Sequence, residues 1–138
     1  MFAKVTDYHA KNHSFISAMD NQIEEFREFR SKMNDRILKE DNLVIKRLFN
    51  LDTNTYKEGA IPVRTKEMLG LVASMVLRCD DCIKYHLEKC YEQAITTEEM
   101  MEIFSVANVV GGTIVIPHTR RAMEYWDILH REAPPEIG

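Results

Sequence analysis

The stretch TKEMLGLVASMVLRCDDCIKYH, residues 65–86, decides how the chain folds. Its first part, residues 65–77, is apolar almost all the way round a helix. Such a helix is buried on several sides, either centrally in one chain or between chains. Two thiols follow, Cys79 and Cys82, and His86 comes four residues after the second. Thiols in a Cys-x-x-Cys pair can close a small disulfide ring, so the stretch predicts a buried helix that leads into a redox site.

The chain before this stretch also predicts helices. Apolar residues recur at helical spacing over residues 14–38, and a shorter helix is expected around residues 43–49. Residues 52–62 contain Asn, Gly and Pro and are expected to form a loop. The stripe of the first helix consists of Phe15, Met19, Ile23, Phe26, Met33 and Ile37.

The chain after residue 79 carries clear start and stop signals for helices. Asp80 is expected to cap a helix that runs to about residue 94, and the sequence from Thr96 to Glu99 is typical of a capping box. The Gly pair at 111–112 should break or kink that helix, and a last helix holds Trp126 as a core residue. No β-hairpin signal separates the runs, so the sequence predicts an all-α fold, a single-domain bundle of about six helices.

The expected organisation has three parts. Residues 1–60 form an N-terminal helical extension packed on the core, residues 61–130 form the core with the CxxC motif, and residues 131–138 form a tail. A chain of 138 residues is long enough for one genuine core but not for two.

Composition excludes several functional classes. The net charge of −4 argues against nucleic-acid binding, because no basic stripe is present to neutralise phosphates. The longest apolar stretch, residues 103–116, is too short to span a bilayer, and no signal peptide is visible. These features predict a cytoplasmic protein with no membrane partner. Cytoplasmic thiols are kept reduced, so three cysteines favour a catalytic or transient disulfide over a structural one.

The position of Cys82 favours a reactive thiol. With Asp80 as the cap, Cys82 lies in the first helical turn, where unpaired N–H groups and the helix dipole stabilise a thiolate. His86 lies at i+4 on the same face, within reach of the sulfur as a base, and Cys79 could meet Cys82 as a resolving thiol. The carboxylates of Asp80 and Asp81 act in the opposite direction.

A zinc site is the alternative chemistry for Cys79, Cys82, His86 and Cys90. Cys82, His86 and Cys90 would span about 12 Å along one straight helix, at a rise of about 1.5 Å per residue. All zinc ligands must lie about 2.0–2.3 Å from the ion, and no Gly turn interrupts the helix. We therefore expect no metal, and we expect Cys90 to be a core thiol.

Further residues complete a family pattern. The pattern consists of Glu67, then eleven residues, then Cys79-x-x-Cys82, then three residues and His86. The segments around it are PVRTKE at 62–67, TTEE at 96–99 and VVGG at 109–112. Over residues 61–112 this pattern resembles the alkylhydroperoxidase D-like, carboxymuconolactone decarboxylase superfamily.

The resemblance implies an all-helical subunit that assembles as a trimer or hexamer, and a thiol-dependent, peroxiredoxin-like alkylhydroperoxidase or disulfide reductase. Cys82 would attack the peroxide with help from His86, Cys79 would condense with the sulfenic acid, and Glu67 would join the proton relay. The implied partners are a peroxide and a dithiol or lipoyl-type reductant, with no bound cofactor. One position departs from the family, since Asp81 stands where peroxidase members carry a second His.

Two other functions stay open at this point. A carboxymuconolactone decarboxylase-type enzyme should not need the thiols, and a non-enzymatic helical oligomer could carry a vestigial CxxC. The remaining histidines suggest no second site: His118 is expected in the core or on the surface, and His9, His13 and His130 are expected to be exposed.

Overall fold

Six α-helices and one 3₁₀ turn make up residues 3–132, the part of the chain that the computed structural model describes, with side chains described for residues 21–131. These residues contain no strand, so the predicted all-α fold of about six helices is confirmed. The elements are α1 Ala3–Leu38, α2 Leu43–Thr55, α3 Val63–Val76, α4 Asp80–Glu92, α5 Thr97–Gly111, η1 Thr113–Val115 and α6 Ile116–Glu132.

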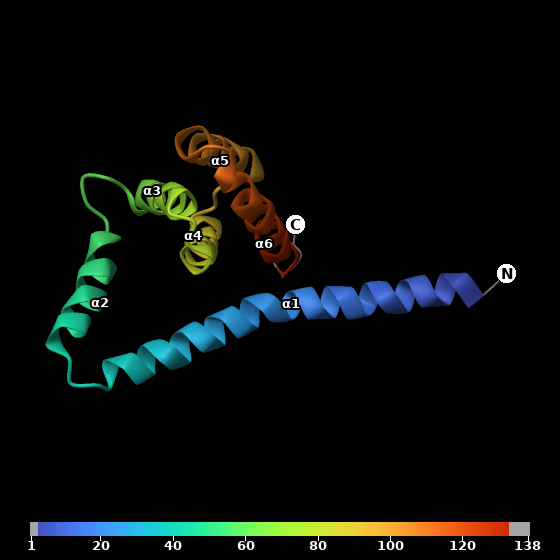
Figure 1. Ribbon diagram of the computed structural model, residues 1–138, viewed down its shortest axis with the longest axis horizontal. Coiled ribbons are helices and arrows are strands. Elements are labelled where there is room, and N and C mark those ends of the chain that lie inside the picture. Colours follow the sequence, from blue (N-terminus) through green and yellow to red (C-terminus); the bar gives the residue numbers. More distant parts are fainter. Residues whose placement is uncertain (1–2, 133–138) are drawn as a thin grey trace.

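Helices α3 to α6 gather in one cluster, and the long helix α1 runs past it as a rod (Figure 1). The most extensive packing joins α3 to α4, α3 to α5 and α4 to α6, while α1 contacts α6. Helix α2 contributes no buried residue and leads back from α1 to the start of α3. None of the described helices is both long and apolar enough to cross a membrane.

The core forms where apolar stripes of these helices meet. Trp126 and Cys90 are fully buried, which confirms both as the core residues that the sequence predicts. Ile23 of α1 is also fully buried, and Phe26 and Met33 of the same predicted stripe are partly buried. Phe15 and Met19 lie outside the side chains that the structure describes.

A tight turn joins α3 to α4. Arg78 adopts a left-handed conformation, with φ of 59°, and its N–H bonds to the carbonyl of Met75. The next N–H, that of Cys79, bonds to the carbonyl of Ser74. This pair of bonds is a Schellman motif, which ends one helix and lets the next begin at once.

The predicted cap of α4 is wrong by one residue. Cys79, not Asp80, is the N-cap: its sulfur accepts the N–H of Cys82 at 3.4 Å, and Asp80 is the first helical residue. The reason is that the carboxylate of Asp80 has partners on another helix, His118 and Arg121. In contrast, the capping box of Thr96 and Glu99 is confirmed in both directions.

Two helices extend beyond their predicted bounds. Helix α1 begins at residue 3 rather than 14, and α2 continues to Thr55, into the expected loop of residues 52–62. In α2 the polar side chains of Thr53, Asn54 and Thr55 bond to backbone carbonyls one turn earlier, at 2.8–3.0 Å. Residues that usually favour turns are thereby accommodated in a helix.

The described part of the chain leaves much apolar surface exposed. In α3, Leu71 and Met75 are buried and Leu69 is 57% exposed, while the C-cap residue Leu77 is 76% exposed. Within a single chain the helix is therefore buried on one side, and the expected burial between chains stays a prediction. In this chain α5 exposes Val109 almost completely, and α2 exposes four large apolar side chains: Leu43, Val44, Leu48 and Leu51.

We expect Thr96→Ala to lower the free energy of unfolding by about 1 kcal/mol, because it removes the oxygen that accepts the N–H of Glu99. Urea unfolding followed by circular dichroism measures the effect. The matched control is Thr53→Ala, which removes an exposed hydroxyl bonded to its own helix and should change stability by less than about 0.5 kcal/mol. Equal effects of the two substitutions would contradict the role of the cap.

Candidate active site

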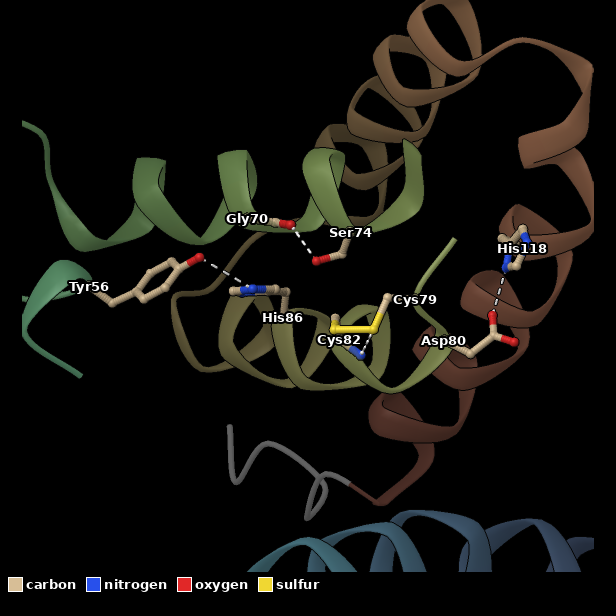
Figure 2. The surroundings of a disulfide bond; sticks show 8 residues. All are labelled: Tyr56, Gly70, Ser74, Cys79, Asp80, Cys82, His86 and His118. Carbon is tan, nitrogen blue, oxygen red and sulfur yellow. Dashed lines mark hydrogen bonds and ion pairs between the residues drawn. A yellow bond between two sulfur atoms is a disulfide. The ribbon is translucent and has the colours of Figure 1, made fainter. Parts of the chain in front are cut away.

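A disulfide joins Cys79 and Cys82 at the start of α4, with their Cα atoms 5.2 Å apart (Figure 2). The turn at Arg78 brings the first thiol to the helix end, and the helix itself places the second one turn later. Cys82 is exposed, whereas Cys90 is free and buried. The structure thus brings together the two thiols that the sequence singles out.

The other two predicted site residues form a buried pair between α4 and α3. Nδ1 of His86 lies 2.8 Å from Oε2 of Glu67, and both residues are less than one-tenth exposed. A carboxylate can only accept a hydrogen bond, so we assign the proton to Nδ1, which leaves Nε2 with a lone pair in the neutral ring.

The remaining nitrogen of His86 faces a residue that the sequence analysis missed. The hydroxyl of Tyr56 lies 3.4 Å from Nε2, and the two rings are 5.2 Å apart (Figure 2). Burial, and then the negative charge of Glu67, raise the pKa of this phenol, so it keeps its proton at neutral pH. Tyr56 lies thirty residues before His86, in a segment expected to be a loop, and no motif marks it.

Gly70 of α3 makes room for this arrangement. A Cβ atom at this position would lie 2.5 Å from Cε1 of His86 and 2.7 Å from the hydroxyl of Tyr56. Both distances are far below van der Waals contact, so any other residue would push the two rings away from the helix. A glycine is therefore required for the close approach of these rings to α3.

His86 makes no hydrogen bond to Cys82 among the interactions of the described residues. In this oxidised state both ring nitrogens have other partners, and the Cys82 sulfur is held in the disulfide. Figure 2 shows the imidazole between Tyr56 and the disulfide, and both His86 and Cys82 line one pocket. The predicted contact between the Cys82 thiol and His86 is therefore absent from this disulfide form.

This pocket has a volume of about 360 Å³ and lies between α1, α2 and α4. Helix α1 contributes an apolar wall and one cation, Arg30, whose guanidinium stacks over the ring of Tyr85 at 4.1 Å. Asp52 of α2 and Asp81 of α4 add two carboxylates. The lining consists of Phe26, Phe29, Arg30, Met33, Asn34, Asp52, Asp81, Cys82, Tyr85 and His86.

The two carboxylates beside the thiols have different surroundings. Asp80 lies 2.7 Å from Nδ1 of His118 and accepts a bond from Arg121 at 3.2 Å. Burial opposes ionisation of Asp80, but the hydrogen bonds of these partners outweigh it and hold the pKa of the carboxyl below its ordinary value. Asp81 is exposed and faces the pocket. His118 is thus placed against Asp80 and not in this pocket, and His130 is exposed as expected.

The third cysteine is chemically separate from the pair. Burial, and then the charge of Glu67, raise the pKa of the Cys90 thiol to about 12, so it stays protonated at neutral pH. Within the described residues no three His, Cys, Asp or Glu side chains are placed to hold a metal ion. His9 and His13 lie outside the described side chains.

Comparison with known proteins identifies curated relatives of uncharacterised function. The chain is 24% identical over 74 residues to a protein of Cupriavidus necator, and 26% identical over 72 residues to a protein of the cox locus of Paracoccus denitrificans. These matches cover 54% and 52% of this chain, and 66% and 65% of the relatives' lengths.

Solved structures give stronger matches. Two crystal structures of one Thermotoga maritima protein are each 48% identical in sequence to this chain, with TM-scores of 0.76 and 0.75. Each match covers 78% of this chain, and the matches cover 94% and 91% of the Thermotoga chains. The second is described as a carboxymuconolactone decarboxylase family protein with an antioxidative response as its candidate role. A Legionella pneumophila protein of the same family shares the fold at 22% identity and a TM-score of 0.58, covering 81% of this chain and 94% of its own.

The sequence profile of the carboxymuconolactone decarboxylase family matches residues 43–125, which include the disulfide, Tyr56, Glu67 and His86. The match spans more than half of the chain and agrees with the resemblance that the CxxC motif carries. The chain therefore belongs to the carboxymuconolactone decarboxylase family.

Proposed function

We propose that this protein is a thiol-dependent alkylhydroperoxidase that cycles between the Cys79–Cys82 disulfide and the two free thiols. The single observation that carries the proposal is the disulfide itself, formed at a helix start in one wall of a pocket that His86 also lines. The antioxidative role suggested for the Thermotoga relative agrees with it.

The reaction cycle balances with a hydroperoxide and a dithiol as reactants. The Cys82 thiolate attacks the terminal oxygen of the peroxide, the O–O bond breaks, and the released alkoxide takes a proton to leave as an alcohol. Cys82 is then a sulfenic acid, and the Cys79 thiol displaces water from it to form the disulfide. A dithiol or lipoyl-type reductant restores both thiols by disulfide exchange. A reducing cytoplasm would keep such a reductant available.

The surroundings of the thiols support this chemistry. Cys82 lies in the first turn of α4, where free N–H groups and the helix dipole favour a thiolate. His86, held by Glu67, is the base nearest in sequence and shares the pocket. The negative charge of Asp80 is compensated by its partners on α6. Of the two adjacent carboxylates, Asp81 is therefore the one that opposes thiolate formation.

We further propose that the protein works as a homo-oligomer, a hexamer or trimer. The apolar side chains exposed on α2, α3 and α5 are more than a small subunit of 16.1 kDa usually leaves in water. Copies of the same chain can cover such surfaces with closed symmetry.

Cys82→Ser should abolish peroxide consumption with dithiothreitol or dihydrolipoamide as reductant, because it removes the attacking sulfur. The matched control is Cys90→Ala, which removes the buried thiol and should retain most of the parent rate. Mass spectrometry of alkylated peptides should show that peroxide removes two hydrogens from the Cys79–Cys82 pair alone.

Turnover that survives in Cys82→Ser, or in parent protein whose thiols have been alkylated, would contradict the proposal. Survival after alkylation would instead favour decarboxylase-type chemistry. Thiols that stay free and fully reactive after a modest excess of peroxide would favour a module without enzymatic activity.

Asp81→His should raise peroxide turnover at pH 7 by about tenfold, because it supplies a group that can exchange protons near neutral pH. Asp81→Asn should move the pH dependence of Cys82 alkylation in the reduced protein to lower pH, since it removes the charge that opposes the thiolate. Asp127→Asn, an exposed carboxylate change on α6, is the control. If neither substitution at Asp81 changes the rates, Asp81 has no part in the relay.

Light scattering at micromolar concentration should report a mass several times 16.1 kDa. Leu48→Glu, which places a charge on the exposed apolar side of α2, should lower that mass if α2 lies between subunits. Lys46→Glu, an exposed charge change on the same helix, is the comparison. A clean monomer of the parent chain would contradict the assembly.

A further inference from the structure

We propose that Tyr56 is a positioning residue of the thiol site, whose hydroxyl holds Nε2 of His86 in both protonation states of the ring. The inference rests on the proposed function and deepens it. It adds to the CxxC, His86 and Glu67 a residue from the end of α2, outside the part of the chain that carries the motif.

The geometry makes His86 a ring with a partner at each nitrogen. Glu67 lies 2.8 Å from Nδ1, and the hydroxyl of Tyr56 lies 3.4 Å from Nε2. His86 is only 7% exposed, so the loss of a partner leaves a polar ring nitrogen that is largely buried. A buried polar group without a partner carries a large free-energy penalty, and the penalty is larger when the group is charged.

A hydroxyl is suited to the nitrogen that changes its protonation. When the ring is neutral, the Tyr56 O–H can donate to the Nε2 lone pair. When the ring has taken the thiol proton, Nε2–H can donate to the same oxygen, because a hydroxyl both donates and accepts. The carboxylate of Glu67 accepts from Nδ1–H in both states. His86 can therefore gain and lose a proton while both nitrogens stay paired.

The proton then follows a balanced path. For Nε2 to take the proton of the Cys82 thiol, the Tyr56 O–H must first turn away from the single lone pair of that nitrogen; the new Nε2–H then donates to the same Tyr56 oxygen. After the thiolate has cleaved the O–O bond, the imidazolium returns the proton to the alkoxide of the substrate. Tyr56 itself neither gains nor loses a proton, which agrees with the raised pKa of its phenol.

Two further contacts hold Tyr56 in this position. The ammonium of Lys66 on α3 donates to the carbonyls of Thr55 and Lys57, at 2.8 and 2.7 Å. These carbonyls lie on either side of Tyr56, so Lys66 fixes the end of α2 over α3. Gly70 leaves the space that both rings fill, since a Cβ there would overlap each of them.

The arrangement bears on the residue that departs from the family pattern. Asp81 stands where a second His is expected, and an ionised Asp cannot donate a hydrogen bond. The other charged or titratable groups of the pocket are Asp52 from α2, Tyr85 from α4 and Arg30 from α1, and none of them has a hydrogen bond to His86 among the described residues. Tyr56 is therefore the neutral donor and acceptor that serves this base.

The test is Tyr56→Phe, examined by nitrogen NMR of histidine-labelled protein in the disulfide form, where no peroxide chemistry is required. The Nε2 resonance of neutral His86 should change, because its lone pair loses a donor. Tyr85→Phe is the matched control, because that ring also lies 5.2 Å from His86 but has no hydrogen bond to it.

The activity arm uses reduced protein and a hydroperoxide in stopped flow. Tyr56→Phe should slow the reaction about tenfold. Should Tyr56→Phe fail to fold, Lys66→Met should change both readouts in the same direction but less, since it keeps the hydroxyl and loosens its support.

The two arms separate the two proposals. An unchanged Nε2 resonance in folded Tyr56→Phe, or in Lys66→Met where it is needed, would overturn the inference. A change of the Nε2 resonance in Tyr85→Phe as large as in Tyr56→Phe would also overturn the inference. A parent protein that does not consume peroxide would overturn the hydroperoxidase assignment, while the NMR result would still decide whether Tyr56 holds His86.

Discussion

The hydrogen bond between Glu67 and His86 is the constraint on which the rest of the site depends. It places a carboxylate and an imidazole in the interior, where neither would be stable without the other. To form it, α3 and α4 must pack closely, and Gly70 must leave the helix surface open. The short turn through Arg78, with its left-handed backbone, makes this close packing possible and brings the thiols to the helix start.

The two acidic residues next to the thiols differ because they face different sides of α4. Asp80 is bound to His118 and Arg121, so its charge is compensated and α4 is held to α6. Asp81, one residue later, points round the helix to the pocket. Successive residues of a helix are rotated by about 100°, which is enough to give the two carboxylates different roles. Asp80 links α4 to α6, whereas the charge of Asp81 acts on the pocket beside Cys82.

Much of the site could be predicted from the sequence because it is local. Cys79, Cys82 and His86 lie within eight residues on one helix, and Glu67 is brought near by a spacing that the family pattern records. Tyr56 could not be predicted, because its contact depends on how α2 returns to α3 and on a clamp from Lys66. The sequence predicts Asp80 as the cap of α4 because Asp is in general a better cap than Cys. Only the fold shows that Asp80 has a partner on α6, which leaves Cys79 as the cap. The extra turn of α2 likewise depends on side-chain bonds to its own backbone.

The N-terminal helix connects the stability of the fold with access to the thiol. Ile23 is fully buried, and Phe26 and Arg30 follow it on the same helical face, at spacings of three and four residues. Phe26 packs edge-on against Tyr125 of α6, and Arg30 stacks on Tyr85 of α4. The face that anchors α1 to the core is therefore also the face that forms the outer wall over Cys82. A change that loosens Ile23 would open the pocket as well as weaken the fold, so the shape of the pocket beside Cys82 and the docking of α1 cannot vary independently.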